Sequence, residues 1–96
     1  MKSEQTIQHE IINFLRSRDY FVTKLIATTT NGIPDLLAVK NGQALFFEVK
    51  RENGELSKLQ KYRIDEINEY AVAVVVRSVT DVEEIINRIE FFNPYF

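Results

Sequence analysis

The sequence contains no cysteine among its 96 residues. That absence excludes disulfide bonds, zinc sites built from thiolates and catalytic cysteines, and it is consistent with a reducing cytoplasm. No apolar run is long enough for a transmembrane helix, and Met1–Gln5 does not lead into a signal-peptide core. Repeats, low-complexity tracts and linkers are also missing. We therefore expect a single cytoplasmic domain over residues 1–96, with no membrane attachment.

The sequence also lacks an excess of basic residues. Fourteen acidic residues against twelve Lys and Arg give a net charge of −2. This balance argues against a protein that binds DNA through bulk, sequence-independent phosphate contacts. The charge is uneven, however, because five basic residues gather in the middle of the chain, Lys50, Arg51, Lys58, Lys61 and Arg63. A local basic surface is therefore compatible with an acidic protein, and Arg51, Lys58 and Lys61 are its candidate nucleic-acid contacts.

A β-hairpin is predicted in the middle of the chain. Two apolar, strand-like runs, Asp35–Lys40 and Ala44–Lys50, flank the dipeptide Asn41-Gly42. This dipeptide is the strongest short hairpin signal, because a type I′ turn needs positive φ at both central residues. A two-residue loop also fixes the register of the two strands, since Lys40 must then pair with Gln43.

The register places two carboxylates face to face. It sets Asp35 directly opposite Glu48, and Cβ atoms of directly opposed residues lie about 4.5–5.5 Å apart. Lys50, two residues beyond Glu48, lies on the same face of the sheet. The non-functional interpretation is that Asp35 begins a strand at a turn and that Glu48 and Lys50 lie on a solvated face. The apolar neighbours Phe47 and Val49 argue against this interpretation, because they indicate a central strand. A buried charge there is costly unless it is paired or binds a metal.

Two opposed carboxylates repel each other, which lowers stability unless something compensates. A divalent cation between Asp35 and Glu48 would remove this repulsion, and a site rich in hard oxygen ligands suits Mg²⁺ or Mn²⁺. The ammonium group of Lys50 beside the metal could orient or deprotonate a water molecule, or neutralise charge in the transition state. The three side chains together therefore indicate a metal-dependent active site.

The remaining elements complete a mixed α/β pattern. We expect helices over residues 3–17, 57–70 and 80–91 and strands over residues 20–27 and 71–76. The apolar run Ala71–Val76 predicts a strand that is buried on both faces. The last helix is expected to begin with the capping box Thr80-Asp81-Val82-Glu83. The predicted order is α-β-β-β-α-β-α, a mixed β-sheet flanked by helices.

Two polar residues on the predicted helices have two interpretations each. Glu10 lies at the margin of the apolar face of the first helix, so it is either a solvated boundary residue or is directed into a pocket. Gln60 completes the pattern Ser57-Lys58-Leu59-Gln60, a capping box in which its side chain reaches back to the Ser57 amide. The alternative places Gln60 at the site, where it would position Lys50, water or phosphate.

These motifs resemble a known nuclease signature. Gly32-Ile33-Pro34-Asp35 followed by Phe47-Glu48-Val49-Lys50 is similar to the two halves of the PD-(D/E)XK motif. Residues 54–60 resemble the segment after the catalytic strand in the VRR-NUC branch of that superfamily, and Val74–Ser78 resembles its closing strand. The resemblance covers residues 10–86 and implies a restriction-endonuclease-like core. Short members of this kind resemble Holliday-junction resolvases in size and layout.

The resemblance implies a function and assigns roles to residues. It implies a Mg²⁺- or Mn²⁺-dependent endonuclease that hydrolyses phosphodiester bonds of DNA, with branched or otherwise structured DNA as the expected substrate. Asp35, Glu48, the Val49 carbonyl and Glu10 would hold the metal, Glu10 directly or through water. Lys50 would position and activate the attacking water, and Gln60 would orient it or touch the scissile phosphate. The rival interpretation is a catalytically silent module that binds nucleic acid or a protein on the same fold.

The last six residues, Phe91–Phe96, include four aromatic side chains. Chain ends are usually polar and frayed, so this end is expected to pack on its own core or on a second subunit. One small domain carries one active site, whereas cutting both strands of a duplex or junction in step needs two sites. We therefore expect a homodimer, with the aromatic end at or near its interface.

Overall fold

The computed structural model describes residues 1–93 of the chain. The described elements follow the predicted order α-β-β-β-α-β-α: α1 (Glu4–Ser17), β1 (Phe21–Lys24), β2 (Leu36–Lys40), β3 (Gln43–Val49), α2 (Lys58–Ile67), β4 (Val72–Val76) and α3 (Val79–Phe92). The predicted aromatic end is covered only in part, because Pro94, Tyr95 and Phe96 lie outside the described residues. Within residues 1–93, the helices are too short or too polar to cross a membrane.

The four strands form one mixed sheet in the order β1-β2-β3-β4. β1 pairs with β2, and β2 with β3, in antiparallel orientation, whereas β3 and β4 are parallel. The predicted hairpin register is confirmed, since Lys40 pairs with Gln43 and Leu36 pairs with Phe47. Asn41 and Gly42 have φ angles of 51° and 80°, as a type I′ turn requires.

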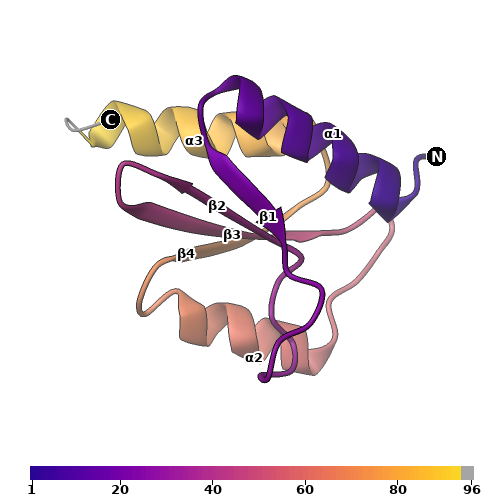
Figure 1. Ribbon diagram of the computed structural model, residues 1–96. Helices are drawn as coiled ribbons and strands as arrows, with labels where there is room; N and C mark the ends of the chain where they lie inside the picture. The colour runs from indigo at the N-terminus through magenta and orange to yellow at the C-terminus, as the bar shows by residue number, and fades with distance from the viewer. Residues whose placement is uncertain (94–96) are drawn as a thin grey trace.

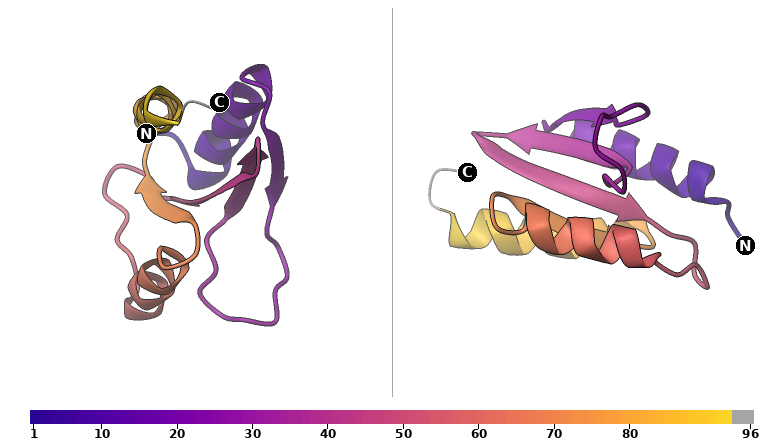
Figure 2. Two further views of the ribbon diagram at one scale, coloured as in Figure 1. Left: turned by 90° about the vertical axis from the view of Figure 1, so that its left-hand side faces the viewer. Right: turned by 90° about the horizontal axis from the view of Figure 1, so that it is seen from below.

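Helices cover both faces of the sheet, with α1 and α3 on one face and α2 on the other (Figure 1, Figure 2). The main hydrophobic core lies between the sheet and the α1–α3 pair, and its fully buried members include Ile11, Leu15, Leu36, Phe47, Val49, Val82 and Ile86. Successive side chains of a strand point to opposite faces. Glu48, between the core residues Phe47 and Val49, therefore points to the face that α2 covers.

The N-cap of the last helix lies two residues before the predicted Thr80, and the helix begins at Val79. Its N-cap is Ser78, whose hydroxyl accepts a hydrogen bond from the Asp81 N–H at 3.2 Å. The Asp81 carboxylate accepts the N–H of Arg77 at 2.8 Å. The prediction that Thr80 opens this helix is wrong, because Ser78 and Asp81 already satisfy the donors at its start.

Two further features, the end of α2 and the burial of β4, differ from those expected from the sequence. Helix α2 ends at Ile67, not Tyr70, because the side chain of Asn68 bonds both the N–H and the carbonyl of Ala73, at 2.7 and 2.9 Å. These bonds turn the chain into β4. The prediction that Ala71–Val76 is buried on both faces is wrong, because β4 lies at the edge of the sheet and only two of its residues, Ala73 and Val76, are buried.

Candidate active site

The predicted meeting of two carboxylates is present at one end of the sheet. Asp35 immediately precedes β2, and its carboxylate accepts the N–H of Val49 at 2.8 Å. Its carbonyl accepts the N–H of Leu25 at 2.8 Å, which fixes the backbone at the strand entry. Glu48 is the second-last residue of β3 and faces Asp35 across the hairpin. The hairpin therefore holds the two acids side by side.

Glu48 is unusually buried for a carboxylate. It is 3% exposed and is the only charged or polar residue among the fully buried side chains of residues 1–93. Burial and, after it, the negative charge of Asp35 raise the pKa of Glu48 from the ordinary value of 4.5 to about 7. The nearby positive charge of Lys50 opposes this rise but does not cancel it. The positive charge of Lys50 therefore does not fully offset the burial of Glu48 and the negative charge of Asp35.

Lys50 approaches the acids from the same face. Its Nζ lies 3.5 Å from Glu48 Oε2, and its side chain is 13% exposed. Its backbone N–H donates to the carbonyl of Val76 at 3.0 Å, which extends the pairing of β3 with β4 by one residue. The sheet therefore fixes the backbone of Lys50, from which its ammonium group reaches Glu48.

Gln60 takes part in the helix cap and also contacts Glu48. Its side-chain Oε1 accepts the N–H of Ser57 at 2.9 Å, and the Ser57 hydroxyl accepts the Gln60 N–H at 3.1 Å, so the predicted capping box is present. The other end of the same amide, Nε2, donates to Glu48 Oε2 at 3.4 Å, a long hydrogen bond. The cap thus fixes which way the amide points, and it points its donor at the acids.

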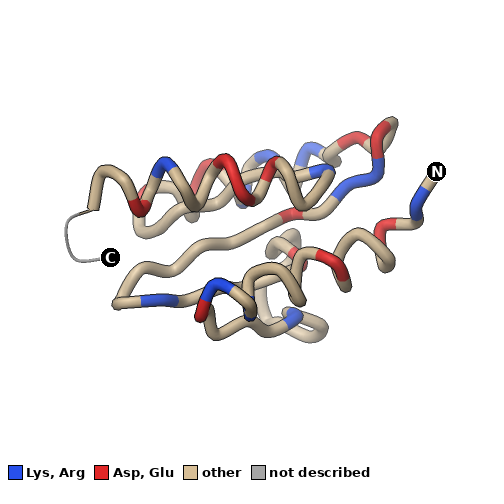
Figure 3. The backbone as a smooth tube through the Cα atoms, turned by 90° about the horizontal axis from the view of Figure 1, so that it is seen from above, with Lys and Arg blue, Asp and Glu red and all other residues tan. Residues whose placement is uncertain are grey.

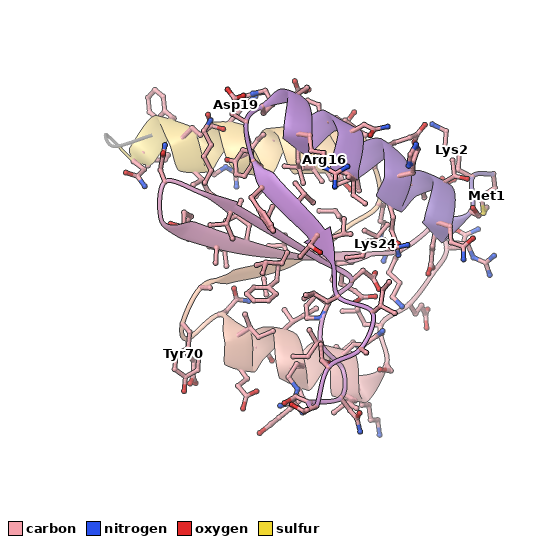
Figure 4. The ribbon with its side chains drawn as sticks, viewed as in Figure 1. Met1, Lys2, Arg16, Asp19, Lys24 and Tyr70 are labelled. Atoms are coloured by element: carbon pink, nitrogen blue, oxygen red, sulfur yellow. The ribbon has the colours of Figure 1, made fainter. Side chains whose placement is uncertain are left out.

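The structure does not bring Glu10 to this cluster. The carboxylate of Glu10, in the middle of α1, pairs with the Nζ of Lys2 at 2.8 Å. Lys2 lies just before the start of α1 (Figure 4). Both residues line a cavity of about 430 Å³ that also includes Glu52 and Arg77 and does not include the acidic pair. Another acid of this helix, Glu4, accepts the N–H of Arg51 at 3.3 Å and so contacts the segment that follows Lys50. A helical periodicity argument cannot find this contact, because it depends on where the distant segment lies.

Basic residues flank the candidate site, as the sequence predicts. Figure 3 shows lysine and arginine positions along the segment that leaves β3 and at the start of α2. The side chains of Arg51, Lys58 and Lys61 are exposed and make no ion pair within residues 1–93. Arg63 is engaged differently: it donates to the carbonyl of Asn31 at 2.9 Å and pairs with Glu66 at 2.7 Å. Three basic side chains are thus available to a polyanion beside the acids.

The donor set at the acids suits a hard divalent cation. It consists of carboxylate oxygens, and burial, followed by the negative charge of Asp35, raises the pKa of Glu48. No group of three or more His, Asp or Glu side chains within residues 1–93 is arranged to hold a metal ion. Mg²⁺ commonly binds proteins through only one or two carboxylates and takes its other ligands from water and substrate phosphate. The two acids therefore fit such an ion better than they fit a closed, all-protein metal site.

Comparisons with known proteins agree with this geometry. The family model of the archaeal Holliday junction resolvase (Hjc) matches residues 3–94. A solved structure described as a VRR_NUC domain is 28% identical, with a TM-score of 0.77, over 88% of this chain and 94% of that one. A second, described as a VRR_NUC domain protein, is 23% identical, with a TM-score of 0.72, over 90% and 86%, and supports the fold alone. The search of curated proteins gives no match.

Proposed function

Since the chain belongs to the archaeal Holliday junction resolvase family and forms a VRR-NUC nuclease domain of the PD-(D/E)XK type, we propose that it is a Mg²⁺- or Mn²⁺-dependent endonuclease of branched or otherwise structured DNA. The observation that carries this proposal is the pair of acids Asp35 and Glu48, of which Glu48 is buried and Asp35 partly exposed. They are held together at the open end of a hairpin, and within residues 1–93 the positive charge that lies against Glu48 is that of Lys50.

The carboxylates of Asp35 and Glu48, with the carbonyl of Val49, would hold the metal ion. A bound divalent cation lowers the pKa of water and neutralises negative charge on phosphate oxygens. The protein's share is to pre-form the ligands. The hydrogen bond from the Val49 N–H to Asp35 fixes one carboxylate, and the Gln60 amide restrains the other. Glu10 takes part only if its side chain leaves Lys2, or through intervening water.

Lys50 and Gln60 supply the polar groups for the attacking water and the phosphate. The ammonium group of Lys50 has three donors and lies 3.5 Å from Glu48 Oε2. From there it can orient a water molecule and stabilise the charge that develops on the phosphate. The Gln60 Nε2 group is a second donor on the same side of Glu48. Donors fixed before the substrate arrives stabilise developing charge without the cost of reorganisation.

The exposed basic residues Arg51, Lys58 and Lys61 would bind the DNA backbone. They lie on the segment that follows Lys50 and on the first turn of α2, which also carries Gln60. Phosphate contacts position a nucleic acid without reading its sequence. Because the chain is acidic overall, we expect affinity to depend strongly on these few residues and on salt concentration.

We further propose that the active form is a homodimer. One domain presents one acidic pair, whereas a four-way junction needs two coordinated cuts, and two sites are most simply related by a two-fold axis. Phe91 and Phe92 at the end of α3 are 80% and 75% exposed, which leaves an apolar surface for a second subunit. This end of α3 lies away from the acidic pair along the sheet (Figure 1).

A substrate panel tests the proposed activity. Purified protein is incubated with duplex, single-stranded and four-way-junction DNA, and with RNA of the same sequences, in Mg²⁺, Mn²⁺ or EDTA. We expect cleavage of junction DNA with either metal and none in EDTA. Stable binding of the junction without cleavage under every metal condition would instead support the silent binding module.

A further inference from the structure

The segment that joins β3 to α2 has no regular secondary structure and yet connects two groups of the proposed site. Residues 51–57 begin directly after Lys50 and end at Ser57, the N-cap that orients Gln60. A loop of this kind keeps its shape only through the hydrogen bonds and packing contacts that it makes. Those contacts therefore decide how accurately Lys50 and Gln60 meet at Glu48.

Arg77 supplies most of these bonds from the end of β4. Its Nη1 group donates to three backbone carbonyls, those of Arg51 at 2.8 Å, Glu52 at 3.3 Å and Gly54 at 2.7 Å. The backbone of Arg77 is itself held, since its N–H donates to the Asp81 carboxylate at 2.8 Å. Charge-assisted bonds are stronger than neutral ones, and the planar guanidinium presents its donors in a fixed arrangement.

The other side of the bend packs directly on Lys50. A Cβ atom at Gly54 would lie 3.5 Å from the Cβ of Lys50 and 3.1 Å from the Glu4 carboxylate. Glu4 also accepts the N–H of Arg51 at 3.3 Å. The bend thus lies between α1 and the side chain of Lys50, with Arg77 holding its carbonyls. A shift of the bend must displace Lys50 or leave it without support.

We propose that Arg77 is a positioning residue for the nuclease reaction, which clamps the bend at residues 51–54 so that Lys50 and the start of α2 keep their places at Glu48. This inference rests on the proposed function for its effect on catalysis. The alternative role for an exposed arginine beside basic residues is a phosphate contact. The three carbonyls bound to Nη1 favour the clamp, because that group is already occupied.

Two variants separate a clamp from a phosphate contact. Arg77→Lys keeps the positive charge, but its side chain is one bond shorter, so its ammonium nitrogen falls short of the position that Nη1 occupies between the three carbonyls. Arg77→Ala removes both. Arg88→Lys and Arg88→Ala, at an exposed position of α3, are the matched controls. Each protein is measured for junction affinity in Ca²⁺, single-turnover cleavage rate in Mg²⁺, melting temperature, and hydrogen exchange of the Gly54 amide, which donates to the Arg51 carbonyl at 2.9 Å.

The clamp predicts that both Arg77 variants lose exchange protection at Gly54. It also predicts a cleavage rate lower by about tenfold or more, because small misplacements of catalytic groups are costly. Junction affinity should stay within about twofold for Arg77→Lys, which keeps the charge. Millimolar guanidinium should partly restore the rate of Arg77→Ala, whereas the Arg88 controls should behave as wild type.

Two results would overturn the inference. One is unchanged protection of the Gly54 amide in both Arg77 variants, because a clamp must protect what it holds. The other is a wild-type cleavage rate for Arg77→Lys together with weaker junction binding by Arg77→Ala, which is the behaviour of a phosphate contact. If the wild-type protein cuts no nucleic acid at all, the proposed function fails, and hydrogen exchange still decides whether the clamp exists.

Discussion

Glu48 is expected to destabilise the metal-free protein at neutral and alkaline pH. Its pKa rises from 4.5 to about 7 in the folded state, first because it is buried and then because Asp35 is negatively charged. The folded state therefore binds more protons than the unfolded state between about pH 4.5 and pH 7, and stability falls as the pH rises through this range. At about 1.4 kcal/mol per pKa unit, the total loss is about 3 kcal/mol.

The substitution Glu48→Gln removes this titration at nearly constant shape. Without metal, the variant should be more stable than wild type by up to about 3 kcal/mol at about pH 8, and similar to it near pH 4.5. For a domain of this size, the difference corresponds to a melting temperature higher by about 10–20 °C at the alkaline end. The gain has this sign because the amide cannot ionise beside Asp35.

Thermal melts across this pH range in EDTA, followed by circular dichroism, measure the difference. Glu69→Gln, at an exposed position, is the control for the chemical change itself and should stay within about 0.5 kcal/mol of wild type. Added Mn²⁺ should raise the melting temperature of wild type and not that of Glu48→Gln. If Glu48→Gln melts below wild type in EDTA at alkaline pH, the ion pair of Glu48 with Lys50 is structural and the reasoning from repulsion is refuted.

Three further predictions concern other residues of the account. Gln60→Ala should slow junction cleavage far more than its loss of about 1 kcal/mol in stability explains. Ser57→Ala should lower stability by a similar amount and leave the rate nearly intact, because it keeps the Ser57 backbone N–H that holds the Gln60 amide and loses only the hydroxyl. Equal effects of Gln60→Ala on rate and stability would show that Gln60 is only a helix cap. A chain ending at Glu90 should be monomeric by light scattering where the full chain is dimeric; a truncated dimer would place the interface elsewhere, and a monomeric full-length chain would remove the dimer. Gly32→Ala should destabilise the protein by more than about 1 kcal/mol in urea unfolding, because φ is +80° and the new Cβ would lie 2.8 Å from the Cγ of Leu59; unchanged stability would show that this contact relaxes freely.

The acidic pair was predictable from sequence because its geometry is local. An Asn41-Gly42 turn fixes the hairpin register, and the register alone brings Asp35 opposite Glu48. The burial of Glu48 was also predictable, since apolar neighbours on both sides indicated a central strand. Gln60 could be found as a capping residue, but that its amide also reaches Glu48 depends on where α2 lies against the sheet.

Contacts between distant segments were not predictable in the same way. Glu10 lies at the margin of a helical face, and only the path of the preceding residues decides that it pairs with Lys2. Arg77 is separated by more than twenty residues from the carbonyls to which it donates, and no local sequence pattern predicts such a contact. The start of α3 was missed for a local reason, because two overlapping capping patterns compete there and Ser78 prevails over Thr80.

We propose that the paired carboxylates make this protein a metal-dependent nuclease, and single-turnover cleavage of a labelled four-way junction in Mg²⁺ tests this. Wild type and Asp35→Asn are compared at equal folded concentration. We expect symmetric nicking by wild type, no cleavage in EDTA, and a rate for Asp35→Asn lower by at least about a hundredfold, with melting temperature preserved. Cleavage by Asp35→Asn at the wild-type rate would contradict this proposal.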